Sequence, residues 1–456
     1  MNASTHAEHA ANDIAAHLHP FTNLATHPQL GPLVIQHGDG IFVEDDQGRR
    51  YLEAMSGLWC ASLGFSNARL AEAGSEALHG LPYYHTFNGR SNPAAIALAE
   101  KLLALAPVPM SKVFFANSGS EANDSAVKLV WYYHNAIGKP EKKKIIARRN
   151  AYHGVTVAAA SLSGLVPNHR DFDLPIDRIL HVDCPHHFRY AEAGESEQDF
   201  ATRLTAALEQ RILDEGPETV GAFIAEPVMG AGGVLVPPAT YFDKVQKVLA
   251  RYEVLLIADE VICGFGRTGQ MFGSATFGLK PDILTAAKAL SSGYVPISAV
   301  MVNEKVHAAV AANSGKIGTF GHGFTYSGHP VACAIALETL KVYEDENIIA
   351  HVQSLVPQFQ QGLQAHAGRR YVGEVRGVGL IGAIELYADP ARRTPFDPAQ
   401  KAGARLAELA LAQGLIVRAM GDSIAFCPPL IITAEQVDDM FARFARAMAI
   451  FEESFA

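Results

Sequence analysis

The sequence predicts an α/β protein with a large, mostly parallel sheet and a smaller α+β domain built from both ends of the chain. From Ser111 to about residue 330, short apolar runs alternate with helical patterns, which is typical of parallel sheets. After residue 330 the pattern changes, and 456 residues exceed one ordinary domain. We therefore expect a large α/β domain over residues 61–330, with residues 1–60 and 331–456 forming the small domain.

Seven apolar runs have the length and composition of buried strands. They are Val113–Ala116, Lys144–Ala147, Ile179–Val182, Val220–Ala225, Val254–Ala258, Ile283–Ala286 and Ile297–Val302. Helical patterns fill most of the gaps between them, including Glu121–Ala136, Gln198–Leu213 and Tyr241–Tyr252. This alternation predicts a mostly parallel sheet of seven strands.

The two ends of the chain have patterns of their own. Residues 1–30 are expected to form a mobile start that leads into one amphipathic segment. The pattern of Ile41–Leu52 predicts a hairpin that turns at Asp46–Gly48. Beyond residue 330 we expect helices and strands in this order: helix Pro330–Glu344, strands Val372–Val375 and Leu380–Leu386, helix Ala399–Gln413 and strand Leu415–Arg418. A last helix carries an apolar stripe typical of ordinary core, formed by Val437, Met440, Phe441, Phe444, Met448 and Phe451.

Composition excludes several classes of partner. The formal net charge of −10 argues against nucleic acid and anionic membranes, and no uninterrupted apolar run approaches membrane-spanning length. Five scattered cysteines without a CxxC pair, and an N-terminus without a secretory signal, fit a reducing cytoplasm. We expect no metal site, because no recognised ligand spacing surrounds the histidines at His6, His9, His17, His19, His186 and His187.

Lys288 is the most informative single residue. It ends the apolar run Ile283–Ala287 and is followed by mostly small residues, Ala289–Gly293. An amine at the edge of a buried strand is partly desolvated, so its pKa falls and it can attack a carbonyl to form a Schiff base. A lone lysine of this kind more often reaches from a core strand to solvent, so other residues must decide between the two roles.

A phosphate site is indicated at Asn117–Glu121, which follows a strand and opens a helix. Free backbone N–H groups and the helix dipole favour an anion there, with Ser118 or Ser120 as the helix cap. The segment has neither the GxGxxG spacing nor the lysine of a P-loop, so a single phosphate is the natural ligand.

A carboxylate and an aromatic ring follow two other strands. Asp259 ends the strand Val254–Ala258, at the sheet edge where open α/β sheets bind ligands, and strand alternation turns Glu260 to the other side. Tyr152 lies just beyond the strand Lys144–Ala147, where its ring can cover a planar ligand. Taken alone, the aspartate could equally cap a turn and the tyrosine could simply pack.

Together these four features match the needs of pyridoxal 5′-phosphate (PLP). A lysine holds the aldehyde of this cofactor and an anion site holds its phosphate. A carboxylate keeps the pyridine nitrogen protonated, so that the ring accepts electrons from a carbanion, while an aromatic residue covers the ring.

The chain resembles a known family over most of its length, from about Leu52 to the C-terminus. The strings LLIADEVICGFGRTGQMFG, PDILTAAKALSSGYVPISAV and HGFTYSGHPVACA are similar to those of class III aminotransferases of PLP fold type I. The strings SGLWC, NSGSEAND and GLIVRAMGDSIAFCPPL narrow the resemblance to the ω-transaminases, and to amine:pyruvate enzymes in particular.

The resemblance implies a role for each residue of a cofactor site. Lys288 is then the Schiff-base lysine and Asp259 pairs with the pyridine nitrogen. The remaining cofactor residues are Ser118, Gly119 and Ser120 at the phosphate, Tyr152 and Val261 on the two ring faces, Glu226 near Asp259, and Thr325 of the neighbouring subunit at the phosphate. A homodimer with two shared active sites follows, with a tetramer also open.

A substrate pocket is implied in the same way. Its apolar walls are Leu58, Trp59, Tyr152 and, from the neighbouring subunit, Phe87. Arg418 pairs with a substrate carboxylate, because a guanidinium grips carboxylates bidentately. Relatives acting on ornithine or γ-aminobutyrate carry a glutamate where this chain has Ala231, so Arg418 lacks that partner and can also swing away for uncharged substrates.

The implied activity is transfer of an amino group from a primary amine or ω-amino acid to a keto acid such as pyruvate, in two half-reactions. Other outcomes of the same chemistry stay open: a decarboxylase, an aminomutase or a racemase. A non-catalytic homologue acting as a binding protein is a further alternative. Diamines, β-alanine, taurine and arylalkylamines all remain candidate donors, and the stereopreference is open.

Overall fold

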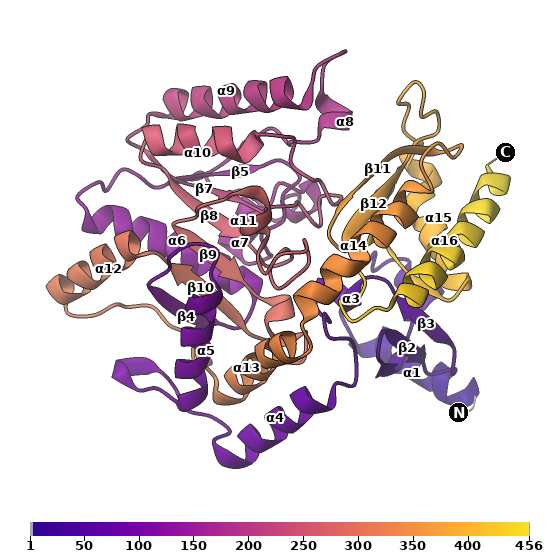
Figure 1. Ribbon diagram of the computed structural model, residues 1–456, viewed down its shortest axis with the longest axis horizontal. Helices are drawn as coiled ribbons and strands as arrows, with labels where there is room; N and C mark the ends of the chain where they lie inside the picture. Colours follow the sequence, from indigo (N-terminus) through magenta and orange to yellow (C-terminus); the bar gives the residue numbers. More distant parts are fainter. Residues whose placement is uncertain (1–2, 456) are drawn as a thin grey trace.

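The computed structural model describes residues 3–455. Figure 1 shows two unequal parts: a large sheet covered by helices, and a smaller part formed by two further sheets and the C-terminal helices. Both chain ends lie in the smaller part, as the sequence predicts. The α/β fold class is confirmed.

The large sheet has seven strands in the order β4-β10-β9-β8-β7-β5-β6. Their bounds are β4 Lys112–Ala116, β5 Lys144–Arg148, β6 Ile179–Val182, β7 Val220–Ala225, β8 Leu255–Asp259, β9 Ile283–Ala286 and β10 Ser298–Val302. Only β10 runs antiparallel to its neighbours. All seven predicted strands are therefore confirmed, together with the mostly parallel arrangement.

Helices cover both faces of this sheet, and the strands are apolar on both sides for that reason. Along β8, Leu256 packs in the core under one helix layer, whereas Ile257 packs in the core under the other. One layer consists of α6 (Gly119–Ala136), α7 (Val157–Leu162) and α12 (Glu304–Ile317), and the opposite layer of α9 (Glu197–Glu215) and α10 (Tyr241–Arg251). The predicted helices match α6, α9 and α10 within a few residues.

The smaller part contains two four-stranded sheets. The first joins β1 (Ile35–Asp39), β2 (Phe42–Asp45), β3 (Arg50–Glu53) and β13 (Leu415–Ile416), and the second joins β11 (Val372–Val378), β12 (Ile381–Leu386), β15 (Ser423–Phe426) and β14 (Arg418–Met420). The predicted hairpin is the antiparallel pair β2–β3, and β13 pairs with β3 in parallel. The first sheet thus ties the N-terminal and C-terminal segments together.

Three features of the smaller part differ from the sequence-based expectation. The single strand expected over Leu415–Arg418 is two strands, because the chain passes from one sheet to the other at Val417. Strands β1 and β15 were not expected, and neither was α14 (Ile348–Gln364). This last helix contains Pro357, which disfavours a helical prediction.

The remaining helices complete the core. They are α3 (Ser56–Trp59), α4 (Ala68–Gly80), α5 (Pro93–Leu105), α8 (His187–Tyr190), α11 (Gly273–Phe277), α13 (Pro330–Asp345), α15 (Ala402–Ala412) and α16 (Ala434–Ser454). Helix α13 begins at the expected domain boundary and packs against α4 and α5, which precede that boundary in the chain. The division at residue 330 stays a prediction. The apolar stripe of α16 is buried, as expected of a core helix.

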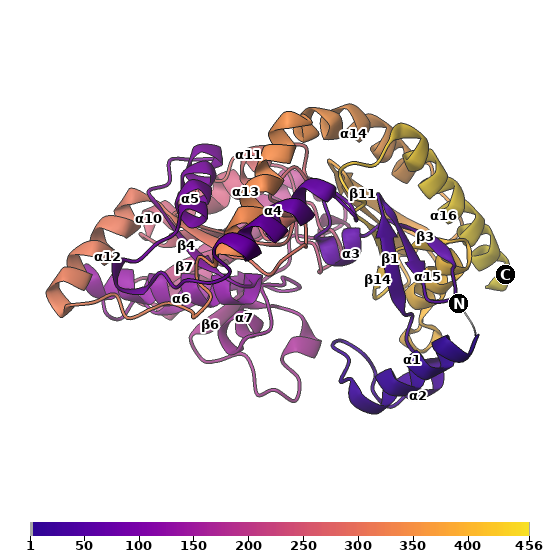
Figure 2. The same cartoon turned by 90° about the horizontal axis from the view of Figure 1, so that it is seen from below.

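The N-terminal segment lies at the edge of the molecule (Figure 2). It forms α1 (Ala3–Ala16), which corresponds to the expected amphipathic piece, and the short α2 (His27–Leu30). His6 and His9 of α1 both contact the Asp46 carboxylate in the β2–β3 turn, at 2.7 and 3.0 Å. No helix within the described range is long and apolar enough to cross a membrane.

Candidate active site

A cavity of about 330 Å³ lies beyond the carboxyl ends of the central strands. Its walls come from residues that follow five different strands of the sheet: Asn117 after β4, Tyr152 after β5, Glu226 after β7, Asp259 at the end of β8 and Lys288 after β9. This is the edge at which open α/β sheets bind ligands. We call it the smaller cavity.

Lys288 lies at the wall of this cavity with its side chain half-buried. Burial lowers the pKa of its amine, and attraction to the nearby Cys60, Asp259 and Glu226 only partly opposes this effect. Its backbone has a φ of 47°, in the left-handed region that a lysine rarely adopts. The local strain and the desolvated amine are both typical of a functional residue.

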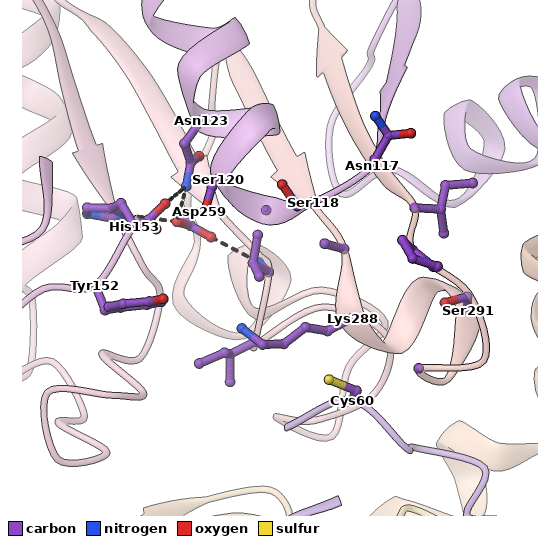
Figure 3. Close-up of a pocket in the computed structure, with 18 of the residues that line it drawn as sticks. Cys60, Asn117, Ser118, Ser120, Asn123, Tyr152, His153, Asp259, Lys288 and Ser291 are labelled. Carbon is purple, nitrogen blue, oxygen red and sulfur yellow. Dashed lines mark hydrogen bonds and ion pairs between the residues drawn. The ribbon is translucent and has the colours of Figure 1, made fainter. Parts of the chain in front are cut away.

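Asp259 is held by three hydrogen bonds, shown in Figure 3. Its Oδ2 accepts from His153 Nδ1 at 2.7 Å and from Asn123 Nδ2 at 2.8 Å, while its Oδ1 accepts from the Val261 backbone at 3.0 Å. Asn123 is fixed in turn, because its Oδ1 accepts from the Thr285 hydroxyl at 2.9 Å. The carboxylate therefore has one orientation relative to the cavity.

Glu260, the next residue, points to the other side of the strand, as alternation predicts. Its carboxylate accepts hydrogen bonds from the backbone N–H groups of Gly273 and Ser274. Burial raises the pKa of Glu260 to about 7. The two neighbouring carboxylates therefore have separate surroundings, and only Asp259 lines the smaller cavity.

The N-terminus of α6 opens onto the same cavity. Ser118 caps the helix, since its hydroxyl accepts from Glu121 N at 3.2 Å, which decides between the two candidate caps. The Ser120 hydroxyl accepts from Val155 N at 3.1 Å. A side chain at Gly119 would lie only 3.1 Å from a methyl carbon of Val261, so the backbone comes close to the cavity there. The first N–H groups of α6 lack intrahelical partners and can bind an anion.

Tyr152 and Glu226 are linked through the backbone. The carboxylate of Glu226 is buried and accepts from Tyr152 N at 3.0 Å and from Gly230 N at 2.9 Å. Burial raises the pKa values of the Glu226 carboxyl and of the Tyr152 hydroxyl. In Figure 3 the Tyr152 ring and the Lys288 amine point into the same hollow.

A second cavity of about 910 Å³, the larger cavity, adjoins the smaller one through Tyr152, Ile262 and Lys288, which line both. Its walls include Leu58, Trp59, Ala231 and Arg418, so four of the predicted substrate residues lie together. Trp59 is 3% exposed and Leu58 is 57% exposed. Arg418 forms no ion pair with a carboxylate within residues 3–455, and burial lowers the pKa of its guanidinium.

Two predicted residues lie elsewhere on this chain. Among the described residues, Phe87 and Thr325 line neither cavity, and both are exposed. They lie close to each other, because Tyr83 donates to the Thr325 carbonyl at 3.0 Å and the Phe87 ring contacts Gly323. Their assignment to a neighbouring subunit stays a prediction.

The sequence did not single out four residues that the fold brings to the site. Asn123 and the His153 side chain hold Asp259, Cys60 lines the smaller cavity, and Phe21 lines the larger one. Asn123 lies four residues after Gly119, so both are on the same face of α6. This spacing indicates that Asn123 faces the same side as the predicted phosphate site. Phe21 contacts Tyr152 edge to face with ring centroids 6.5 Å apart, a contact across 131 positions that no local pattern indicates.

Comparison with known proteins gives consistent matches over nearly the whole chain. The family model described as aminotransferase class-III matches residues 24–448. The chain is 51% identical over 440 residues to γ-aminobutyrate transaminase 1, mitochondrial, of Oryza sativa subsp. indica, covering 96% of this chain and 85% of that one. It is 49% identical to vanillin aminotransferase of Capsicum chinense, covering 96% of each.

A solved structure has the same fold. The ω-transaminase from Pseudomonas jessenii, in complex with PMP, superposes with a TM-score of 0.97 at 55% identity, covering 98% of both chains. The arrangement of helices and strands described above is therefore that of an experimentally known ω-transaminase.

Proposed function

Because the chain belongs to the class-III aminotransferases, which transfer amino groups with PLP, we propose that its substrates are a primary amine or ω-amino acid as donor and a keto acid, foremost pyruvate, as acceptor. Family membership and the superposition support amino transfer. The choice of substrates rests on the larger cavity, and above all on Arg418.

The residues of the smaller cavity fit PLP. The N-terminus of α6 with Ser120 would hold the phosphate, and Asp259 would hold the pyridine nitrogen. Tyr152 and Val261 line the space between them, where a flat ring would lie. The Lys288 amine, whose pKa is lowered by desolvation, suits covalent attachment to an aldehyde. When bound, PLP carries the amino group between substrates and withdraws electrons from the reacting carbon.

Lys288 would also move the proton that the reaction requires. Its amine lines both cavities, so it faces the cofactor position and the substrate position together. A desolvated amine is uncharged in a larger fraction of molecules near neutral pH, and can therefore accept a proton from the substrate carbon. The same nitrogen would return this proton to the carbon of the second substrate.

Asp259 would keep a proton on the pyridine nitrogen. His153 and Asn123 are positioning residues for this carboxylate, because both donate to the same oxygen, Oδ2. Glu226 would fix the Tyr152 backbone, and with it the aromatic ring. None of these groups needs to move during the reaction, which is typical of electrostatic preorganisation.

Arg418 is the observation that carries the substrate proposal. It is a half-buried guanidinium on the wall of a large cavity that also has apolar residues such as Leu58, Trp59 and Ile262 and charged residues such as Arg189 and Asp422. A carboxylate of pyruvate or of an ω-amino acid such as γ-aminobutyrate would satisfy it. Position 231 on the wall of this cavity is an alanine, and Arg418 has no ion-pair partner among residues 3–455, so uncharged arylalkylamines would also fit.

The assembly we propose is a homodimer with shared active sites. Tyr83, Tyr84, Phe87 and Tyr326 are 40–57% exposed, and the Tyr83 and Tyr326 rings lie 5.9 Å apart. An exposed cluster of large aromatic residues is typical of a protein–protein interface. Phe87 and Thr325 lie in this cluster, so both would reach the neighbouring subunit's site. The mass of the particle in solution, measured by light scattering, tests the dimer against a tetramer.

The proposed compartment is the cytoplasm. All five cysteines are free thiols, which a reducing compartment maintains. Microscopy of two fluorescent fusions, one with the reporter at the N-terminus and one with it at the C-terminus, tests this assignment.

A donor screen tests the substrate proposal. Purified holoenzyme receives pyruvate and one donor at a time: γ-aminobutyrate, β-alanine, taurine, a diamine or an arylalkylamine. We expect alanine to accumulate with donors of both the carboxylate-bearing and the uncharged arylalkyl type. Release of carbon dioxide or inversion of alanine, without amino transfer, would instead support a decarboxylase or a racemase.

A further inference from the structure

Three histidines and one aspartate meet in the N-terminal segment. Asp13 of α1 contacts His17 Nδ1 at 3.2 Å through Oδ1, and contacts His19 Nε2 at 2.7 Å and His27 Nε2 at 3.2 Å through Oδ2. The sequence separates these residues by up to fourteen positions. The fold thus builds a cluster that their spacing does not reveal.

The three imidazole rings surround the carboxylate closely. The His19 ring lies 4.2 Å from the His17 ring and 4.3 Å from the His27 ring, centroid to centroid. The side chain of His27 is only 11% exposed, whereas that of His17 is 60% exposed. The cluster therefore has a protected side and a side open to solvent, and it lies where α1 and α2 meet (Figure 2).

We propose that this cluster is a zinc site. The ligand atoms of Asp13, His17 and His19 all lie within 4.8 Å of one another, and His27 adds a fourth donor next to Asp13 Oδ2. Ligands of a tetrahedral zinc ion at about 2.0–2.1 Å are separated by roughly 3.3 Å. The present contacts from the Asp13 carboxylate to the three histidines, at 2.7–3.2 Å, are close to this separation.

The donor set indicates the class of ion. Three imidazoles and one carboxylate suit zinc, whereas magnesium and calcium take oxygen ligands almost exclusively. The exposed His17 side leaves a path by which the ion can enter. Four protein ligands close the coordination sphere, so the ion would have a structural role.

A second histidine-containing cluster lacks these properties. His186, Glu374 and Glu385 also approach one another, but Arg376 donates to both carboxylates and Arg189 binds Glu385. Two guanidinium groups already supply the positive charge there. The zinc proposal is therefore specific to the N-terminal cluster.

Zinc would close a loop that reaches the larger cavity. The segment between the ligands His19 and His27 contains Pro20 and Phe21, which both line that cavity. Phe21 has a φ of 48°, and its side chain is 69% exposed although it contacts Tyr152. An ion bound by His19 and His27 would fix the two ends of this loop, and so hold Phe21 at the mouth of the cavity.

The zinc content of the purified protein tests the proposal, and the measurement requires no substrate. Holoenzyme is equilibrated with zinc sulfate and dialysed, and bound zinc is measured by mass spectrometry of the metal. We expect about one zinc per chain in the wild type, and loss of that zinc in His19→Gln and in Asp13→Asn. His9→Gln is the matched control, because it breaks a similar histidine–aspartate contact on the same helix and should keep the zinc.

Hydrogen exchange gives an independent measurement. Zinc should slow the exchange of residues 17–27 in the wild type and in His9→Gln, but not in His19→Gln. Absence of bound zinc in the wild type, equal zinc in His19→Gln, or unchanged exchange over residues 17–27 would overturn the proposal. Each of these outcomes leaves the amino-transfer assay unaffected, so failure of the zinc site and failure of the proposed function are told apart.

Discussion

The smaller and larger cavities share Lys288 and Tyr152, yet they are built in different ways. The smaller cavity takes its charged residues from the ends of consecutive strands, and hydrogen bonds fix the two carboxylates, Asp259 and Glu226. The larger cavity takes its walls from many distant segments, including those around residues 20, 58, 231 and 418, and several of these side chains are exposed.

This difference separates chemistry from selectivity. Groups that move protons or hold charge need fixed positions, which a central sheet provides. Groups that admit different substrates can lie on segments that shift with respect to one another. Substitutions in the smaller cavity should therefore lower the rate for every substrate, whereas substitutions in the larger cavity should change the rate for some substrates and not for others.

The largest effect is expected for Lys288→Ala. Amino transfer should fall by at least about 10⁴-fold with every donor, because in the proposed mechanism one nitrogen both binds the cofactor and moves the proton. Initial rates of alanine formation from pyruvate measure the loss. Borohydride treatment followed by peptide mass spectrometry should find the cofactor on Lys288 in the wild type only.

Lys142→Met is the matched control for Lys288→Ala. Lys142 is buried, and burial lowers its pKa to about 8, but it donates to the carbonyls of Val220 and Tyr252 at the other end of the sheet. Its loss should lower stability and leave the turnover of folded enzyme near that of the wild type. Turnover by Lys288→Ala at the wild-type rate would exclude the assigned role.

Asp259→Asn should lower kcat by about 10²–10³-fold with all donors, because the fixed negative charge is lost. Asn123→Ala should lower kcat by about tenfold, since it leaves the charge but removes one hydrogen bond that orients it. Single-turnover absorbance changes of the bound cofactor measure both.

Glu260→Gln changes the neighbouring carboxylate, which faces away from the cavity, and should alter the melting temperature with little effect on kcat.

Arg418→Ala should act on one half of the reaction. The half-reaction with pyruvate should slow by about 10- to 100-fold, the value of a charge-assisted bond to a carboxylate. The half-reaction with an uncharged arylalkylamine should change by less than about threefold. Stopped-flow measurement of each half-reaction gives the two rates. Equal losses in both would remove the distinction between the cavities.

Ala231→Glu sharpens the same test. A carboxylate on the wall that carries Arg418 would form a competing ion pair, which pyruvate must displace. The KM for pyruvate should rise by about tenfold, while the KM for an uncharged amine stays unchanged. An unaltered KM for pyruvate would show that Arg418 does not bind its carboxylate.

The smallest effect concerns the pH dependence of the free energy of unfolding, which changes through one carboxyl group near the larger cavity. Burial raises the pKa of Glu53 from its ordinary 4.5 to about 7, and this carboxyl group accepts from Gly57 N in the turn that carries Leu58 and Trp59. The folded state therefore holds a proton that the unfolded chain releases. The stability contributed by this group is present below pH 4.5 and is lost as the pH rises towards 7.

Glu53→Gln should remove this part of the pH dependence. Between pH 5 and pH 8 the free energy of unfolding of the wild type should fall by at least about 1 kcal/mol relative to that of the variant. The melting temperature should fall by roughly 2–4 °C. Calorimetry at several pH values measures it. A constant difference between the two proteins over this range would contradict the raised pKa.

The sequence predicted the smaller cavity better than the larger one for a physical reason. Asp259 and Lys288 stand next to apolar runs, so local patterns both identify the strands and place the side chains at the sheet edge. Asn123 was missed because its partner, Asp259, is 136 positions away. Its role depends on how α6 packs on the sheet.

The larger cavity depended on resemblance and on the fold. Arg418 has no local signal beyond its position at a strand end, and the strand itself was predicted as one when it is two. Phe21 and the histidine cluster lie in residues 1–30, for which the sequence predicts a mobile start leading into one amphipathic segment, whereas the structure has two helices there, α1 and α2. Contacts between distant segments decide these features, and periodicity does not report such contacts.

The change of sheets at Val417 links two walls that are far apart along the chain. Leu415 and Ile416 are paired with Leu52 and Glu53, just before the turn that bears Trp59, while Arg418 is paired with Ala425 in the other sheet. Adding or deleting a single residue between Ile416 and Arg418 would rotate the guanidinium to the opposite side of its strand and leave Trp59 in place. Evolution, or an engineer, could thus exchange the carboxylate recognition proposed for Arg418 for a neutral lining through loop length alone, without replacing any residue of the smaller cavity.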